Sequence, residues 1–191
     1  MHRRQVLIAG LCAGLSAPAL AQQRLFKFDP ATFPNINYEG RKLVAYKTKE
    51  APGTIIVRAD QRRLYKVLED GRALQYGVGV GREGFGWAGV AEIARKAIWP
   101  NWHPPKEMIE RELKQHGRRL PDIMPGGPEN PLGARALYLF QGKRDTLYRI
   151  HGTNDPSSIG RAVSSGCIRL LNEEIIELYE TTPIGTKVIV A

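Results

Sequence analysis

The chain has 191 residues and a formal net charge of +9 at pH 7, with 28 Lys and Arg against 19 Asp and Glu. This length suffices for one domain with a substantial core. The charge favours anionic surroundings such as envelope polymers or lipid head groups, and a solvated basic surface that aids solubility explains it equally well. Because no nucleic-acid recognition motif accompanies the charge, we expect no nucleic-acid partner.

Residues 1–21 are predicted to be a cleaved export signal. Arg3-Arg4 forms a charged start, 6–15 is a short apolar run, and Ala19-Leu20-Ala21 fits a small-x-small cleavage site. The apolar run is too short for a membrane span, so we expect none. The paired arginines also fit a twin-arginine signal, so this route and the general secretory (Sec) route both stay open, and both predict a periplasmic protein. Cleavage would remove Cys12 and leave 170 residues with a net charge of +7.

The first half of the mature chain is predicted to be strand-rich. Residues 22–52 form a lead-in segment of mixed composition, and the domain itself covers 53–191. Three short strands are expected at 54–57, 64–68 and 73–80, and their tight turns predict an antiparallel meander. Glycines then crowd the stretch up to Gly89, where we expect sharp bends and close backbone approach before a strand at 90–98.

The second half adds two helices to further strands. Lys106–His116 is a helix that Pro105 can start and Gly117 can stop, with Met108, Ile109 and Leu113 on one face. After a loop, strands are expected at 134–140 and 146–150, then a helix capped by Asn172 with Glu173 and Glu174 at its dipole, then a strand at 187–190. The sum predicts a mostly β fold, with a mixed β-sandwich-like arrangement and two short helices.

Cys167 would be the single cysteine of the mature protein, within Ser164-Ser165-Gly166-Cys167-Ile168-Arg169. A leftover thiol in an exported protein is either paired with another molecule or kept reactive. A free thiol has a pKa near ~8.5, so a nucleophilic role needs a base, and His151 lies sixteen residues upstream at the end of a predicted strand. The amides of Gly166 and Cys167 are candidate donors to an oxyanion.

Structural interpretations of the same residues stay open at this point. A lone cysteine often fills a core, and a histidine at a strand end is often a polar cap. The residues that usually ligate metals are His103, His116, His151 and Cys167 in the mature chain. No two of them have ligand spacing, so we expect no metal site.

The ordered set of motifs resembles the L,D-transpeptidase catalytic domain family (YkuD domain). The resemblance covers roughly residues 53–191, and it rests on five segments: 99–105, which is rich in Trp and Pro, 125–139, 150–153, 164–170 and 183–190. Many family members have His where this chain has Ser165, and others have Ser.

This resemblance implies a fold, an activity and a set of partners. Cys167 would attack the carbonyl of the third residue of a peptidoglycan tetrapeptide stem, release D-Ala and form a thioester, with His151 as base and then acid. An amine of a second stem, or of an envelope lipoprotein, would take the acyl group. Ser164, Ser165 and Gly166 would shape the loop. Carbapenem-type β-lactams would acylate Cys167, and no nucleotide, metal or other cofactor is implied.

Four residues are predicted to contact substrate. Arg169 would pair with a carboxylate, or would serve equally well as a structural ion-pair partner. Gly152 and Thr153 follow the histidine. Trp102 would line the groove together with Trp99, although at least one of these two is more typical of a core.

Two other functions remain alternatives. Water in place of the amine would make the protein an L,D-carboxypeptidase. A non-catalytic peptidoglycan-binding module would use the same groove without needing the cysteine and histidine. The inserted segment 106–128 is predicted to act as a lid that excludes water and so favours transfer over hydrolysis.

Overall fold

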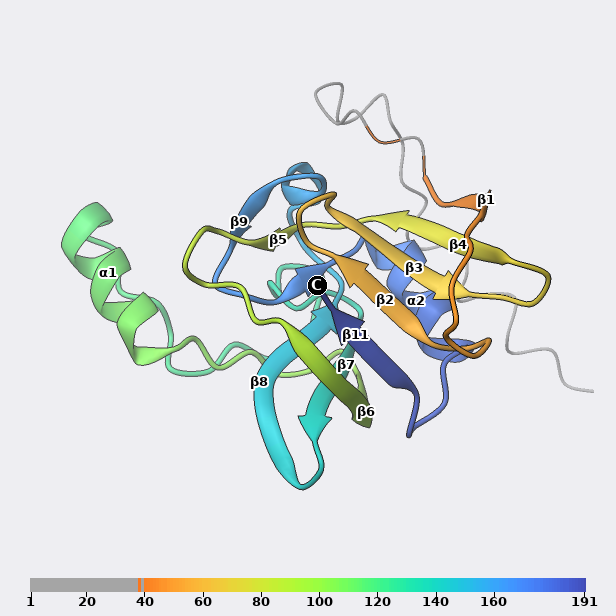
Figure 1. Cartoon of the computed structure of the whole chain (residues 1–191). Coiled ribbons are helices and arrows are strands. Elements are labelled where there is room, and N and C mark those ends of the chain that lie inside the picture. Colours follow the sequence, from red (N-terminus) through yellow and green to blue (C-terminus); the bar gives the residue numbers. More distant parts are fainter. Residues whose placement is uncertain (1–37, 39) are drawn as a thin grey trace, which may run out of the picture.

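The computed structural model describes residues 38 and 40–191, so the predicted export signal lies outside the described residues. Nine strands form one mixed sheet in the order β1-β4-β3-β2-β11-β6-β7-β8-β10, and β5 and β9 form a second, two-stranded sheet (Figure 1). The strands are β1 (Lys42–Ala45), β2 (Ile55–Arg58), β3 (Arg63–Val67), β4 (Arg72–Gly77), β5 (Val80–Gly81), β6 (Gly89–Ile98), β7 (Arg135–Gln141), β8 (Arg144–His151), β9 (Ala162–Ser164), β10 (Ile168–Arg169) and β11 (Lys187–Val190).

The predicted meander is confirmed, because β2 pairs with β3 and β3 with β4, both antiparallel. The β3–β4 turn places Asp70 and Gly71 at φ of 57° and 66°, a conformation that Gly and Asp tolerate best. Strand β1 was not predicted. It pairs with β4 at one edge of the sheet, and its four residues are exposed or half-buried, which leaves little hydrophobic pattern to reveal it.

Strand β11 joins the two halves of the sheet. It pairs parallel with β2 on one side and antiparallel with β6 on the other. The sheet curls, so that Tyr76 of β4 and Ile150 of β8 belong to one core cluster although their strands lie in different halves. Because burial of apolar area is the main favourable term in folding, this shared core ties the meander to the strands that carry the site.

Helix α2 (Asn172–Glu180) packs against this core, and Ile175 and Leu178 are fully buried. The Nζ of Lys96 in β6 donates to the carbonyls of Tyr179 and Thr182 at its end, at 2.5 and 2.8 Å. A 3-10 turn spans Pro156–Ser158. The observed sheet and two α-helices confirm the predicted mostly β fold.

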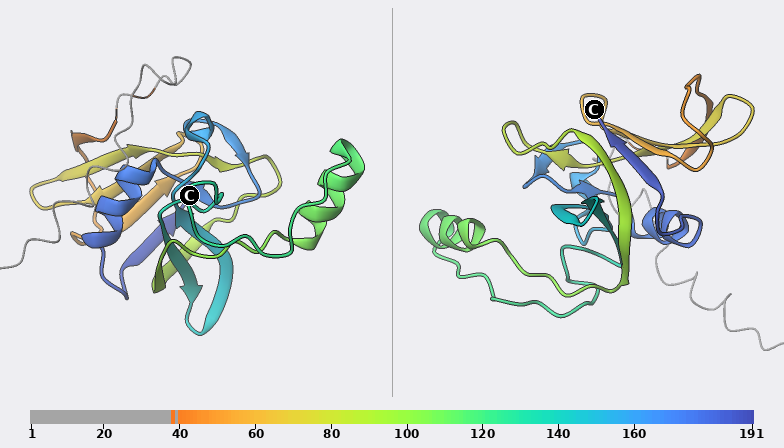
Figure 2. Two further views of the ribbon diagram at one scale, coloured as in Figure 1. Left: turned by 180° about the vertical axis from the view of Figure 1, so that it is seen from behind. Right: turned by 60° about the horizontal axis from the view of Figure 1, so that its bottom comes forward.

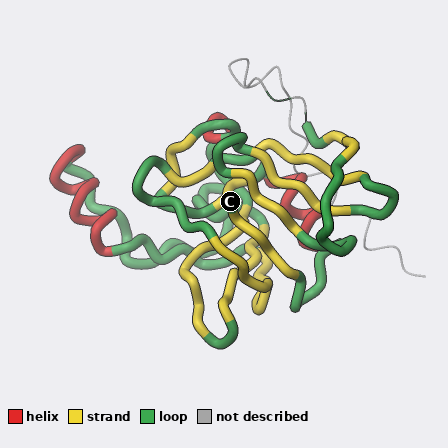
Figure 3. The backbone as a smooth tube through the Cα atoms, viewed as in Figure 1, coloured by secondary structure: helices red, strands yellow, loops and turns green. Residues whose placement is uncertain are grey.

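Helix α1 (Lys106–His116) has the predicted limits, with Pro105 as N-cap and Gly117 as a left-handed C-cap at φ 63°. None of its residues is buried, and it stands apart from the sheet in each view (Figure 2). Loops on both sides connect it to β6 and β7 (Figure 3). We call residues 99–133 the excursion. Among the described residues, no helix is both long enough and apolar enough to cross a membrane.

Candidate active site

One strand pair sets the positions of His151, which ends β8, and of Cys167, which directly precedes β10. Strands β8 and β10 are parallel, with Ile168 opposite Ile150 and Arg169 opposite His151. Ile150 and Ile168 are buried in the core, so the alternating residues project from the other face of the sheet. Cys167, two residues before Arg169, therefore shares that face with His151, which lies on the neighbouring strand and two residues further along.

The ring of His151 is fixed by its own backbone neighbourhood. Its Nδ1 lies 2.5 Å from the carbonyl oxygen of Gly152. A carbonyl only accepts, so Nδ1 carries the proton and Nε2 keeps its lone pair. Burial lowers the pKa of His151 to about 3, with a further contribution from the Arg169 cation, while the carbonyls of Gly152 and Leu132 oppose the shift. At neutral pH the imidazole is uncharged and able to accept a proton.

Burial also raises the pKa of the Cys167 thiol, although the Arg149 backbone and the cations of Arg149 and Arg169 lower it in part. Both members of the pair are thus uncharged in the free protein. This uncharged state favours a mechanism in which the thiol gives up its proton as it attacks the substrate, over one that starts from a thiolate–imidazolium ion pair.

The loop that carries Cys167 is held by Ser164. The Ser164 hydroxyl donates to the Cys167 carbonyl at 2.6 Å and accepts from the Gly166 amide at 3.1 Å. Gly166 has φ 123°, and an added Cβ would lie 2.6 Å from the Tyr148 ring and 2.8 Å from the Phe85 carbonyl oxygen. Only glycine fits here. Because its amide is already bonded to Ser164, the Cys167 amide is the stronger candidate for an oxyanion donor, while Ser165 is exposed.

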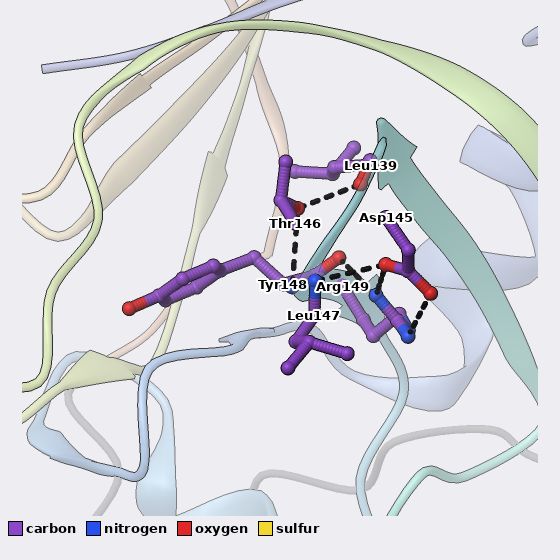
Figure 4. Close-up of polar contacts among 6 residues, drawn as sticks. All are labelled: Leu139, Asp145, Thr146, Leu147, Tyr148 and Arg149. Carbon is purple, nitrogen blue, oxygen red and sulfur yellow. Dashed lines mark hydrogen bonds and ion pairs between the residues drawn. The ribbon is translucent and has the colours of Figure 1, made fainter. Parts of the chain in front are cut away.

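A bulge in β8 sets the directions of the Tyr148 and Arg149 side chains (Figure 4). The Thr146 hydroxyl donates to the Leu139 carbonyl at 2.6 Å and accepts from the Tyr148 amide at 3.2 Å, and Leu147 has φ 65°. Beyond the bulge, Tyr148 packs on Trp87 while the Arg149 guanidinium donates to both oxygens of Asp145 at 2.7 and 2.9 Å. Bulges near active sites often re-aim side chains in this way.

The remaining predicted site residues are less open to a substrate. Thr153 is buried, and its hydroxyl accepts from the Asp155 amide at 3.0 Å, so it supports the loop after the histidine. Gly152 is also buried and orients the histidine through its carbonyl. Trp102 forms a bridge with Met124 at the base of the excursion. Arg169 is half-buried, and its Nε has no hydrogen-bond partner within the described structure.

Asn172 is the functional residue that the sequence interpretation missed. The predicted capping role is wrong, because Leu171 is the N-cap and no side chain caps the helix. The Asn172 side chain instead accepts from the Ala134 amide at 2.9 Å and donates to the Thr153 carbonyl at 3.0 Å. Its Oδ1 fills the space that a Cβ of Gly133 or Gly152 would need, at 2.2 Å from each. It therefore fixes the loop whose Gly152 carbonyl orients His151.

The part of the chain that the structure describes contains no group of three or more His, Cys, Asp or Glu side chains placed to hold a metal ion. The glycine cluster contains a G-x-G-x-x-G spacing from Gly79 to Gly84. A dinucleotide site needs a helix directly after this motif, and here a loop and strand β6 follow. The glycines serve close approach instead, since a Cβ on Gly81 would lie 2.9 Å from the Gly166 Cα.

The amino-acid sequence is similar to those of known proteins. Residues 52–190 match the family described as L,D-transpeptidase catalytic domain (YkuD). The probable L,D-transpeptidase YbiS of Escherichia coli is 37% identical over 140 residues, which cover 71% of this chain and 43% of that protein. The chain thus matches less than half the length of that relative. A putative L,D-transpeptidase of Fuscovulum blasticum is 36% identical over 98% of this chain and 96% of its own length.

A solved structure from Brucella melitensis is 42% identical, with a TM-score of 0.55 over 85% of this chain and all of that chain. That protein is named a probable carnitine operon oxidoreductase. The glycine motif of the present chain lacks the helix that a dinucleotide-binding oxidoreductase of the usual kind needs.

Proposed function

The chain belongs to the L,D-transpeptidase catalytic domain family, and from that premise we propose that it is a periplasmic, cysteine-dependent L,D-transpeptidase acting on peptidoglycan stem peptides in cell-wall remodelling. The observation that carries the proposal is the placement of His151, with Nε2 available, on the same sheet face as Cys167. A binding module has no need of this arrangement, and a nucleophile with an oriented base does.

The proposed reaction uses these groups in sequence. The Cys167 sulfur attacks the carbonyl carbon of the third stem residue as its proton passes to His151 Nε2. The Cys167 amide donates to the oxyanion. The carbon–nitrogen bond then breaks, Nε2 returns the proton to the amine of the departing D-Ala, and a thioester remains. An acceptor amine attacks this thioester, gives a proton to Nε2, and the thiol is restored.

Arg169 is proposed to hold a carboxylate of the stem. Its buried, unpartnered Nε projects from the face that carries His151 and Cys167. Leaving a buried donor without an acceptor costs free energy. A carboxylate that accepts from this guanidinium removes that cost, so it should bind more tightly than a carboxylate at an exposed arginine.

The experiment that tests the proposal is intact mass spectrometry of the wild type and of Cys167→Ala with a disaccharide-tetrapeptide. Loss of D-Ala with a thioester on the wild type only, followed by a cross-linked dimer, supports the transpeptidase. A tripeptide without dimer indicates either hydrolysis or the need for a protein acceptor such as an envelope lipoprotein. Unchanged peptide with retained peptidoglycan binding by both proteins would favour the binding module.

Hydrolysis is the second candidate, because α1 has no buried residue and stands away from the sheet, so it does not cover the site in this structure. The lid role of 106–128 stays a prediction. It requires that deletion of this segment lower the ratio of transfer to hydrolysis, and an unchanged ratio would refute it.

Carbapenem-type β-lactams are expected to acylate Cys167, since a strained lactam carbonyl presents the thiol with the same reaction as the stem amide. Intact mass should rise by the mass of one drug molecule in the wild type and stay constant in Cys167→Ala. An unmodified wild type in excess drug would contradict this expectation.

A further inference from the structure

A row of four side chains crosses the sheet face that carries His151, which we call the open face, and this row ends at Cys167. Arg95 of β6 lies opposite Tyr138 of β7, and Tyr138 lies opposite Arg149 of β8. The parallel register of β8 and β10 places Cys167 next to Arg149. The row therefore runs Arg95, Tyr138, Arg149, Cys167 across four neighbouring strands.

The ring of Tyr138 holds both guanidinium groups in place. The Cζ of Arg95 lies 3.6 Å from the ring centroid, and the Cζ of Arg149 lies 4.4 Å from it. Tyr138 is only 7% exposed, so its ring is covered rather than free. Stacking on an aromatic face orients a guanidinium at a fixed position without using its hydrogen-bond donors.

The two arginines differ in how their charge is balanced. Arg149 is bonded through two nitrogens to both carboxylate oxygens of Asp145. Arg95 is exposed, and within the described residues its guanidinium has no ion pair. The Arg95 charge still acts on Asp145, because it helps to lower the pKa of that carboxyl. The cluster of Arg95, Arg149 and Asp145 thus has a net charge of one positive unit. The excess charge lies on Arg95, which is exposed to solvent.

Backbone irregularities converge on this row. The β6–β7 register shifts between Ile93 and Arg95, directly before the arginine. The β7–β8 register shifts between Tyr138 and Phe140, where the β8 bulge lies. Each shift changes which side chains lie on this face of the sheet. Both bulges are therefore needed for Arg95 and Arg149 to face Tyr138 together.

We infer that Arg95 is a carboxylate-binding subsite for the substrate, distinct from Arg169, and that it receives an anionic group of the stem peptide lying across the strands from Cys167. This inference rests on the proposed function. Three strand spacings of ~4.8 Å separate β6 from β10, roughly 14 Å or four extended residues. Arg169 lies along the strand direction from Cys167, and Arg95 lies across it. The two cations therefore suit a branched donor with two carboxylates.

Besides the carboxylate of the departing D-Ala, a stem whose third residue is diaminopimelate carries two carboxylates of this chemistry: that of the second residue and that on the diaminopimelate side chain. Both would accept two hydrogen bonds from the guanidinium fork, which a lysine ammonium does not reproduce. A test with three synthetic tetrapeptides separates these two, with the D-Ala carboxylate free in each: one with both carboxylates free, and two with one or the other converted to a carboxamide.

The test measures the rate constant of thioester formation at low peptide concentration, by intact mass, for wild type, Arg95→Gln, Arg95→Lys and the control Arg144→Gln. Arg144 begins β8 at the hairpin end and is exposed, so its removal changes net charge equally without touching the row. We expect Arg95→Gln to lose about tenfold on the free peptide, Arg95→Lys to lose less, and Arg144→Gln to stay near wild type.

With the amidated peptides the wild type should fall about tenfold on one of the two only, and Arg95→Gln should show no further loss on that peptide. This pattern identifies the carboxylate. Equal losses of Arg95→Gln on all three peptides, or a loss no larger than that of Arg144→Gln, would overturn the subsite while thioester formation by the wild type leaves the proposed function standing. A wild type that forms no thioester with any peptide overturns the proposed function and the subsite with it.

Discussion

The loop that carries Cys167 and the excursion differ in what holds their backbone. The first is held by side-chain hydrogen bonds. Ser164 binds the Cys167 carbonyl within the loop, and Asn172, just after it, binds the Thr153 carbonyl in the segment that follows His151. The excursion is held at its base, where Trp102 and Met124 exchange backbone hydrogen bonds and Asn130 donates to the Pro100 carbonyl at 3.1 Å. Reacting groups need fixed relative positions, whereas a segment with few packed contacts can move at little cost.

The largest expected effect comes from Gly166→Ala. The added methyl group would overlap the Tyr148 ring and the Phe85 carbonyl at a φ that alanine disfavours, so the loop must shift and displace the sulfur. We expect acylation to fall by at least about a hundredfold, since a displacement of ~1 Å at a reacting group costs this much. Gly127→Ala in the excursion is the matched control, because an added Cβ there meets nothing within 4 Å. Equal activity of the two variants would contradict the contrast.

Asn172→Ala should come next. Loss of its two hydrogen bonds releases the Thr153 carbonyl and the Ala134 amide, which hold the loop that carries the Gly152 carbonyl, the acceptor that orients His151. We expect kcat to fall about 10- to 100-fold with KM little changed, and Asn172→Asp to recover only part, since it keeps an acceptor for Ala134 and loses the donor to Thr153. Asn101→Ala removes the acceptor of the Gly126 amide in the excursion and should leave kcat unaltered. A rise in KM alone would argue against positioning.

Glu174→Gln tests a buried group outside the site. Burial raises the pKa of Glu174 to about 7 from its ordinary 4.5, while a hydrogen bond from Tyr38 opposes the shift. The folded state therefore holds the proton to higher pH than the unfolded state, and stability is lost as pH rises from about 4.5 to 7. At pH 8 the variant should be more stable by up to about 3 kcal/mol, and at pH 4 the difference should vanish.

Denaturant unfolding at both pH values measures this difference, with Glu110→Gln on the exposed face of α1 as control. The control should change the free energy of unfolding by less than about 0.5 kcal/mol at either pH. A variant that is less stable than wild type at pH 8 would show that the Glu174 carboxylate is stabilising.

The smallest expected effect is a flat pH profile. Because burial holds the pKa of His151 near 3, the rate of Cys167 acylation should show no inflection between pH 5 and 7, where an ordinary histidine titrates. Stopped-time mass spectrometry across that range, with a neutral acyl donor to avoid titrating the substrate, provides the measurement. An acid limb centred near 6.5 would mean that the ring is more accessible to water than its burial indicates.

The sequence was sufficient for features that depend on local patterns. Helix α1 and strand β11 have the predicted limits, His151 ends strand β8 as expected, and Cys167 lies in the glycine-containing loop as expected, directly before β10. Local patterns failed where a side chain bonds far along the chain. Asn172 looks like a cap in sequence, and its partners Ala134 and Thr153 are 38 and 19 residues away.

The row from Arg95 to Cys167 was also beyond a sequence-based interpretation. Its members alternate correctly only because the register shifts in two strand pairs, and a one-residue shift sends every later side chain to the opposite face. No residue type marks either bulge. The Gly166 amide is a further case: its sequence neighbours suit an oxyanion donor, but in the fold this amide donates to the Ser164 hydroxyl.

The place of β11 in the sheet has a consequence for how the molecule assembles. This strand follows all others in sequence, yet it lies between β2 and β6 and is the joint between the meander and the strands of the site. Until it is synthesised, the two halves cannot form one sheet, and their shared core stays open. Its pairing with β2 spans more than 130 residues, a separation of the kind that slows folding. The nucleophile therefore becomes part of a complete sheet only after the final strand has inserted.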